Sequence, residues 1–282
     1  MWIWLSLVSA CLLGLYDVCK KKALGSNSVL WVLFAATGLS TLFLAPWLRA
    51  GTPAEHLQLS FKAVLVTTSW VSGLLGMKFL PLTTVSTIKG SRPVFVVLFS
   101  ILLFGEKLAL LQWVGVLLAL SALGLLSVSS KKEVGAEART RGFVHMGISV
   151  LAGVASALYD KYIMAQMEPV FVQSWSNLYI TVILALCLGV QALLQRDNFK
   201  KFEWDWTLVI IAVLITVSDF IYFYSLKSPG SMLSIISVVR RSSVIFTFIF
   251  GALIFKERNV KVKAFALSVM AAGVLLLLLC TR

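Results

Sequence analysis

Four basic residues lie inside long apolar stretches of the chain. They are Lys89 and Arg92 in the segment STIKGSRPVF, and Arg240 and Arg241 in the segment SVVRRSSVIF. A charged side chain at the centre of a membrane helix costs at least ~2.5 kcal/mol, so four unpaired ones would be hard to tolerate. We therefore expect these side chains to face protein, water or a small anionic ligand.

Three aspartates in the same kind of stretch offer a competing interpretation. Asp219 is deep within its stretch and is the best-placed partner for the arginines, whereas Asp17 and Asp160 lie nearer to stretch ends. A buried ion-pair network could simply neutralise the cations. Four cations against at most three carboxylates leave positive charge that a bound anion would balance. Asp219 could alternatively carry a proton, because a membrane environment disfavours the ionised carboxyl.

Tyrosines accompany these aspartates in the sequence. A phenol can donate a hydrogen bond to a polar ligand, so we expect the tyrosines at the same binding site. Tyrosines near helix ends also anchor membrane proteins at the lipid–water interface, and that alternative stays open. The complete set of candidate substrate-binding residues is Lys89, Arg92, Arg240, Arg241, Asp219, Tyr16, Asp17, Tyr159, Asp160 and Tyr222.

The elements that must position these residues are membrane helices. Of the 282 residues, 59% are apolar and 13% are charged, and the mean hydropathy is +0.94, far above that of a soluble domain. About 20 apolar residues suffice for a helix to cross the hydrocarbon of a bilayer, and the short alternating segments of a membrane β-barrel do not occur. We predict an all-α polytopic membrane protein with ten spans, at approximately 2–19, 28–48, 61–79, 82–104, 108–129, 142–163, 170–194, 206–226, 231–255 and 260–280.

Short motifs recur in the two halves of the chain, on either side of the polar connector SSKKEVGAEARTRG. The tripeptide LYD occurs at residues 15–17 and again at 158–160. FGEK at residues 104–107 returns as FKER at 255–258. These matches indicate an internal repeat of five helices.

An offset of 151 residues lays Lys89 on Arg240, so the cationic position is itself duplicated. Because five is odd, the second half must enter the membrane in the opposite direction, which makes the repeat inverted. Inverted repeats can alternate between inward-open and outward-open states around a site near the midplane, although a duplication kept only for packing is the simpler alternative. We divide the chain into a first repeat, 1–130, a cytoplasmic linker, 131–141, and a second repeat, 142–282.

The charge distribution predicts topology and excludes several function classes. The net charge of +13 comes mostly from loops and span ends, so it indicates positive-inside orientation, not nucleic-acid binding. We expect both termini to be extracytoplasmic, in the inner membrane of a bacterium. None of the four cysteines shows CxxC spacing, and the sequence contains neither a Gly-Lys dipeptide nor HExxH, so we expect no cofactor, metal, ATP drive or enzyme activity.

The stretch PVFVVLFSILLFGEKLALLQWVGVLLAL, residues 93–120, and the ten-helix duplication resemble the drug/metabolite transporter superfamily, in particular its bacterial EamA-type members. Within that superfamily, the segments around Lys89 and Arg240 are similar to helices four and nine of plastid sugar-phosphate/phosphate translocators. Those helices hold phosphate with a lysine and a Lys-Arg pair, so the resemblance implicates Lys89, Arg240 and Arg241 in anion binding. The sequence departs from that pattern at Gly90 and Arg240, and it adds Arg92.

The sequence thus predicts a secondary transporter that moves a small phosphate- or carboxylate-bearing metabolite by alternating access. Its expected partners are the lipid bilayer and the substrate, which could be exchanged for a second anion or for protons, and we expect a monomer or homodimer. An exporter of amino acids or amphipathic drugs, with purely structural buried charges, is one alternative. A lipid flippase or another non-transporting membrane protein is a further one.

Overall fold

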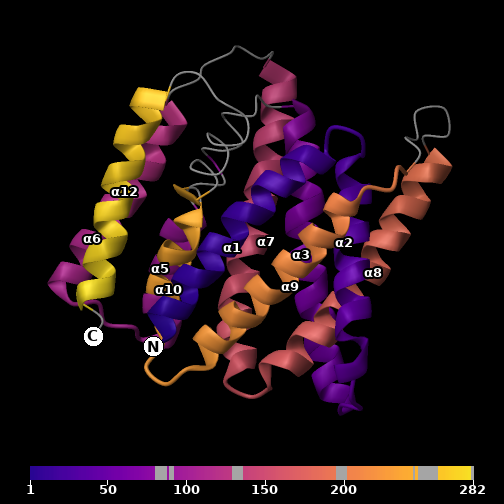
Figure 1. Cartoon of the computed structure of the whole chain (residues 1–282), viewed down its shortest axis with the longest axis horizontal. Helices are drawn as coiled ribbons and strands as arrows, with labels where there is room; N and C mark the ends of the chain where they lie inside the picture. The colour runs from indigo at the N-terminus through magenta and orange to yellow at the C-terminus, as the bar shows by residue number, and fades with distance from the viewer. Residues whose placement is uncertain are drawn as a thin grey trace.

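The computed structural model describes residues 1–79, 88, 92–128, 136–194, 202–243, 245–246 and 260–280 (Figure 1). These residues form α-helices, one short 3-10 helix (η1, Ala45–Trp47) and connecting loops. The described α-helices are α1 (Trp2–Ala23), α2 (Val29–Leu44), α3 (Pro53–Phe79), α5 (Arg92–Phe104), α6 (Leu110–Val128), α7 (Ala136–Met164), α8 (Pro169–Leu194), α9 (Trp206–Lys227), α10 (Leu233–Arg241) and α12 (Val260–Cys280).

Six described helices are long and apolar enough to cross a membrane: α1, α2 with η1, α3, α7, α8 and α9. Shorter apolar helical segments cover Arg92–Phe104, Leu110–Ala122 and Ser268–Cys280. Each of the ten described α-helices coincides with one of the ten predicted apolar runs, which confirms the all-α membrane fold class.

Polar side chains at the loop boundaries set where several helices begin. The Ser28 side chain accepts the Trp31 N–H at the start of α2, and the Asp205 carboxylate accepts the Thr207 N–H at the start of α9, at 2.9 Å. Such caps satisfy backbone donors that have no partner within the helix.

The start of α3 corrects the predicted third span. The sequence interpretation began this span at Phe61, but the helix begins about two turns earlier, at Pro53. Thr52 and Glu55 form a reciprocal capping box there: the Thr52 N–H donates to Glu55 Oε2 at 2.7 Å, and the Glu55 N–H donates to Thr52 Oγ1 at 3.3 Å. Consequently Lys62, the second residue of the predicted span 61–79, lies well inside α3.

The two halves pack as pseudo-two-fold-related copies. In chain order, α1, α2, α3 and α6 of the first half correspond to α7, α8, α9 and α12 of the second. Helices α5 and α10 belong to the fourth predicted span of each half but cover different parts of it, because the 151-residue offset lays Leu233–Arg241 on residues 82–90. The contacts between α1 and α9 are matched by those between α7 and α3, and the contacts between α1 and α10 by those between α7 and α5. The pairs α2–α8 and α6–α12 each join equivalent helices, and α5 packs on α10.

Figure 1 shows the inversion directly: α1 starts at the lower edge of the molecule, whereas α7 starts at the upper edge. The second half therefore enters the membrane in the opposite direction from the first, as the odd helix number predicts.

Glycines allow α6 and α12 to approach closely. A Cβ on Gly273 would lie 2.7 Å from the Gly115 carbonyl oxygen and 2.8 Å from the Ala119 backbone nitrogen. Because both neighbours are backbone atoms, they cannot move aside without shifting a whole helix. Small residues at a membrane helix interface gain van der Waals contact in this way.

Candidate functional site

The short helix α10 places two of the predicted cations in the interior. Arg240 and Arg241 lie in its last turn, and the helix ends at Ser242, a turn residue whose dihedral angles stay in the right-handed helical region. The Ser242 N–H and hydroxyl both bond to the Val239 carbonyl, at 3.0 and 2.6 Å. The two guanidinium groups thus lie at the negative end of the helix dipole, which favours cations.

Glu106, the glutamate of the FGEK motif, fixes the other end of α10. Its carboxylate accepts the backbone N–H of Leu233 at 2.5 Å and that of Ser234 at 3.0 Å, and it also accepts the Ser234 hydroxyl. The preceding loop is held by Lys161, whose ammonium donates to the Ser231 carbonyl and hydroxyl. A carboxylate at a helix N-terminus accepts hydrogen bonds from the free N–H groups, and its negative charge is attracted by the positive end of the helix dipole. Glu106 therefore stabilises both the position and the start of α10.

A cavity of about 230 Å³ opens beside the last turn of α10. Helices α1, α5, α7, α9 and α10 contribute its walls. The lining residues are Leu13, Arg92, Pro93, Val96, Ala157, Asp160, Tyr222, Ser237, Arg240, Arg241 and Ser243. Five of the ten candidate residues from the sequence therefore share one cavity.

Arg240 is paired with a carboxylate, although its buried Nε has no hydrogen-bond partner among the described residues. Its guanidinium forms an ion pair with Asp219 of α9, the aspartate that the sequence indicated as the arginines' partner. The same guanidinium lies 4.0 Å from the centre of the Tyr222 ring, a cation–π contact. These contacts hold Arg240 against α9.

Arg92, at the first position of α5, reaches across to α7. Its guanidinium donates a hydrogen bond to the Gly153 carbonyl, and a Cβ at Gly153 would lie only 2.5 Å from the guanidinium carbon. The absence of a side chain at this glycine is what lets Arg92 pack on the α7 backbone. This arginine is anchored by a neutral acceptor, so its positive charge is not neutralised by the contact.

Asp160 joins the cavity to a buried lysine behind it. The Asp160 carboxylate forms an ion pair with Lys62 of α3 and accepts a hydrogen bond from the Tyr222 hydroxyl at 3.4 Å. The Lys62 ammonium also lies 4.7 Å from the centre of the Phe223 ring. The sequence interpretation missed Lys62 because it placed the start of this helix too late; the capping box at its true start was the available signal.

Arg241 is the least partnered charge of the group. Its Nε is buried and, like the Nε of Arg240, has no hydrogen-bond partner within the part of the chain that the structure describes. The negative charge of Asp17, an exposed residue of α1 outside the cavity lining, acts favourably on it. Unsatisfied buried donors are rare in proteins, and they often mark the place of a ligand or water.

The remaining candidates lie elsewhere. Tyr16 packs in a separate cluster with α2 and α9, where the Lys20 ammonium is 5.4 Å from its ring centre. Tyr159 contacts the rings of Phe61 and Tyr162 and is absent from the cavity lining. Lys89 lies outside the described residues, so its predicted place in the site stays a prediction.

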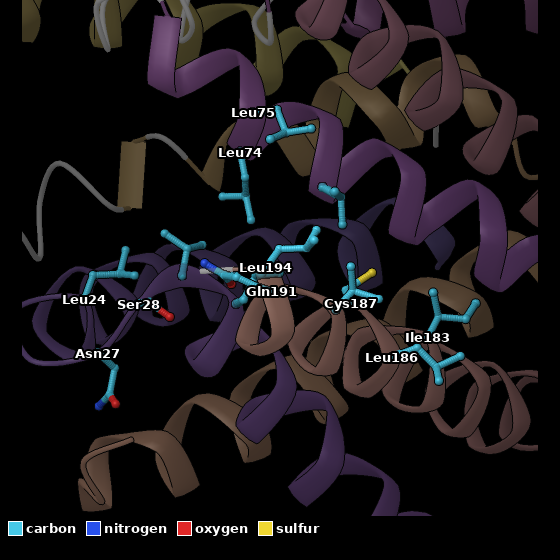
Figure 2. Close-up of a pocket in the computed structure, with 14 residues that line it drawn as sticks. Leu24, Asn27, Ser28, Leu74, Leu75, Ile183, Leu186, Cys187, Gln191 and Leu194 are labelled. Carbon is cyan, nitrogen blue, oxygen red and sulfur yellow. The ribbon is translucent and has the colours of Figure 1, made fainter. Parts of the chain in front are cut away.

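A larger groove lies apart from the charged cavity, between α2, α3 and α8. It measures about 930 Å³, and Figure 2 shows leucines of α3 and α8 around it together with Leu24. Its polar lining is confined to Asn27, Ser28, Cys187 and Gln191, and none of its lining residues is charged. The groove is therefore suited to hydrocarbon, and the cavity at α10 is suited to ions.

The comparisons with known proteins agree with this architecture. A profile of the EamA-like transporter family matches the chain twice, over residues 1–128 and 141–279. No curated protein sequence matches significantly. Among solved structures, the crystal structure of a protein with 13% sequence identity is similar over 99% of this chain and 96% of its own, with a TM-score of 0.78, which shows a shared fold. The chain is a multi-pass integral membrane protein that belongs to the EamA-like transporter family, within the drug/metabolite transporter superfamily.

Proposed function

We propose that this protein is a secondary transporter that moves a small anionic metabolite, bearing a phosphate or carboxylate, by alternating access, and that it has no enzyme activity. The observation that carries the proposal is the charge of the cavity at α10. Arg240 is neutralised by Asp219 and Lys62 by Asp160, which leaves Arg92 and Arg241 without an ion-paired carboxylate among the described residues, with Asp17 acting on Arg241 from outside the cavity. A bound anion would compensate this excess of positive charge and supply an acceptor for the Arg241 donor.

The size of the cavity restricts the substrate. Sites for drug-sized ligands usually measure about 300–1,000 Å³, and this cavity of about 230 Å³ is smaller. Guanidinium groups present paired N–H donors that match carboxylate and phosphate oxygens. The Tyr222 hydroxyl and the side chains of Ser237 and Ser243 line the same space and supply neutral hydrogen-bonding groups. We therefore favour a small metabolite with one anionic head group.

Binding to the purified chain in detergent tests the proposal. We expect pyruvate and glycerol 3-phosphate to raise Tm, and neutral glycerol at the same concentration to leave it unchanged. Arg241→Gln should weaken the anion effect by about tenfold or more, since a hydrogen bond to a charged group contributes about 1.5–3 kcal/mol. Glutamine keeps much of the side-chain volume while removing the charge.

Lys227→Gln is a matched control, because Lys227 bonds the Met167 carbonyl at 3.0 Å and does not line the cavity. It should bind the anions as the parent does. Uptake of a stabilising anion into proteoliposomes would then test transport. Anion effects that are equal in the parent and in Arg241→Gln would overturn the anion-site proposal.

The groove between α2, α3 and α8 favours a second candidate function, export of amphipathic compounds. Its apolar walls and about 930 Å³ could accept a larger hydrocarbon-bearing molecule. In that case amphipathic compounds, and not small anions, would stabilise the protein. Leu186→Trp, which fills the groove from α8, would abolish that stabilisation, whereas Arg241→Gln would leave it intact.

A further inference from the structure

Anion binding by the arginines leaves the buried pair of Lys62 and Asp160 without a role. Lys62 is 4% exposed and Asp160 is 6% exposed, so both charges are almost entirely removed from water. Removing two charges from water is costly, and an ion pair of this kind is no general route to stability. Asp160 nevertheless lines the cavity, with Lys62 directly behind it. The position of the carboxylate between a lysine and the anion cavity suggests a function.

Charged and titratable groups face Asp160 from four helices. Lys62 comes from α3 and forms the ion pair. From α9, Tyr222 donates a hydrogen bond and Asp219 adds a negative charge that Arg240 of α10 holds. Arg92 of α5 lines the same cavity, and Lys89 lies outside the described residues.

Protonation of Asp160 would change the electrostatics of the cavity by one unit. The carboxylate would become neutral, and the Lys62 ammonium would lose its counter-ion while keeping its own charge. The cavity would then attract an anion more strongly. A bound anion would, in turn, favour protonation of Asp160, because the coupling between two binding equilibria is reciprocal.

Asp160 fits this role better than Asp219. Asp219 is paired with an arginine, which keeps its proton at all physiological pH values, and its side chain is 30% exposed. It also does not line the cavity. Asp160, in contrast, is 6% exposed and shares the cavity with the arginines.

The pair also joins the two repeats. Lys62 belongs to α3 of the first half and Asp160 to α7 of the second, and these two helices pack against each other. Alternating access requires the halves to move relative to one another. Neutralising Asp160 would weaken a contact between the halves at the same time as the anion binds.

We propose that Asp160, backed by Lys62, is the proton site of this transporter, and that one proton is taken from solution onto the Asp160 carboxylate for each anion bound. This inference rests on the proposed anion transport. It makes the transporter a proton–anion symporter.

Calorimetry with sulfate tests the linkage on the full chain in detergent. Sulfate resembles a phosphate head group but stays a dianion between about pH 5 and 8, so any pH dependence belongs to the protein. Titrations in two buffers with different ionisation enthalpies give the number of protons taken up. We expect uptake approaching one proton per sulfate near neutral pH, and an affinity that rises by up to about tenfold for each unit of pH decrease.

Two variants separate the proton site from structural roles. Asp160→Asn should bind sulfate with no proton uptake and with an affinity independent of pH. Because that variant leaves Lys62 buried without its counter-ion and could fail to fold, the double variant Lys62→Met with Asp160→Asn provides a neutral version. It too should bind without proton uptake, but more weakly than Asp160→Asn. Glu168→Gln, which changes an exposed acid, should behave as the parent.

The outcomes distinguish the two proposals. Saturable sulfate binding that Arg241→Gln weakens, but that shows no proton uptake in the parent, would overturn the proton site and leave the anion site standing. Proton uptake that persists in either Asp160 variant would also overturn it. Absence of saturable sulfate binding to the parent would overturn the proposed anion transport, and the proton linkage with it.

Discussion

Glu106 offers the sharpest test of how the site is held in place. Its carboxylate accepts two backbone N–H groups and one hydroxyl at the start of α10, the helix that ends with Arg240 and Arg241. In Glu106→Gln the NH₂ of the side-chain amide replaces one carboxylate oxygen and cannot accept a hydrogen bond from the N–H groups of α10. At least one charge-assisted hydrogen bond, of about 1.5–3 kcal/mol, is therefore lost. The lost charge at the helix N-terminus adds about 0.3–1 kcal/mol.

The expected destabilisation of Glu106→Gln is therefore about 2–4 kcal/mol, which lowers Tm by at least roughly 4 °C. Sulfate affinity should fall as well, since α10 carries two of the cavity's arginines. Thermal unfolding of the purified protein in detergent measures the first effect and calorimetry the second.

Glu168→Gln is the matched control for this change. Glu168 forms an ion pair with Arg49 at 3.1 Å, but the two side chains are 61% and 59% exposed. Exposed pairs contribute about 0–1 kcal/mol, so the control should move Tm little. If Glu106→Gln proves no more destabilising than Glu168→Gln, the claim that this glutamate holds α10 is wrong.

Other substitutions test packing, capping and the buried pair. Gly273→Ala should cost about 1–3 kcal/mol by forcing α6 and α12 apart, whereas Gly189→Ala, with open space around its Cβ, should leave Tm unchanged or raised. Asp205→Ala should cost about 1 kcal/mol at neutral pH. The hydrogen bonds that its carboxylate accepts from the start of α9 lower the pKa of Asp205, so the difference from the parent should vanish as pH falls through that pKa in acid titrations of stability. Lys62→Met should cost about 3–5 kcal/mol by leaving Asp160 unpaired, and the double variant with Asp160→Asn should recover most of that loss in denaturation.

Much of the fold was predictable because hydrocarbon imposes a simple rule on the sequence. A span must be long, apolar and helical, so the ten runs could be read without knowledge of any contact. Boundaries were less predictable, because a helix can continue beyond the hydrocarbon into more polar sequence. The α3 helix illustrates this: PAEHLQLS is too polar to count as a span, but the Thr52–Glu55 capping box starts the helix there.

The arginines of the site were predictable because an uncompensated charge inside an apolar run is conspicuous. The partners of those charges were not. The sequence singled out Asp219 as the arginines' partner, but Lys62 was overlooked, and the roles of Glu106 and Gly153 depend on contacts between helices far apart in the chain. Only the packing of α3 on α7 brings Lys62 to Asp160.

The repeated LYD motif shows why a duplicated sequence does not imply a duplicated site. Both copies lie on equivalent helices, α1 and α7, and those helices make equivalent contacts, α1 with α9 and α7 with α3. The environment of each aspartate is set by its partner helix: α3 presents Lys62 to Asp160, and Asp17 is exposed on α1. The helix contacts thus retain the symmetry of the repeat, while the buried ion pair of Lys62 and Asp160 occurs at only one of the two positions within the described chain. The proposed proton site and anion cavity agree with this asymmetry, since a second buried carboxylate at the position of Asp17 would offset the charge of Arg241.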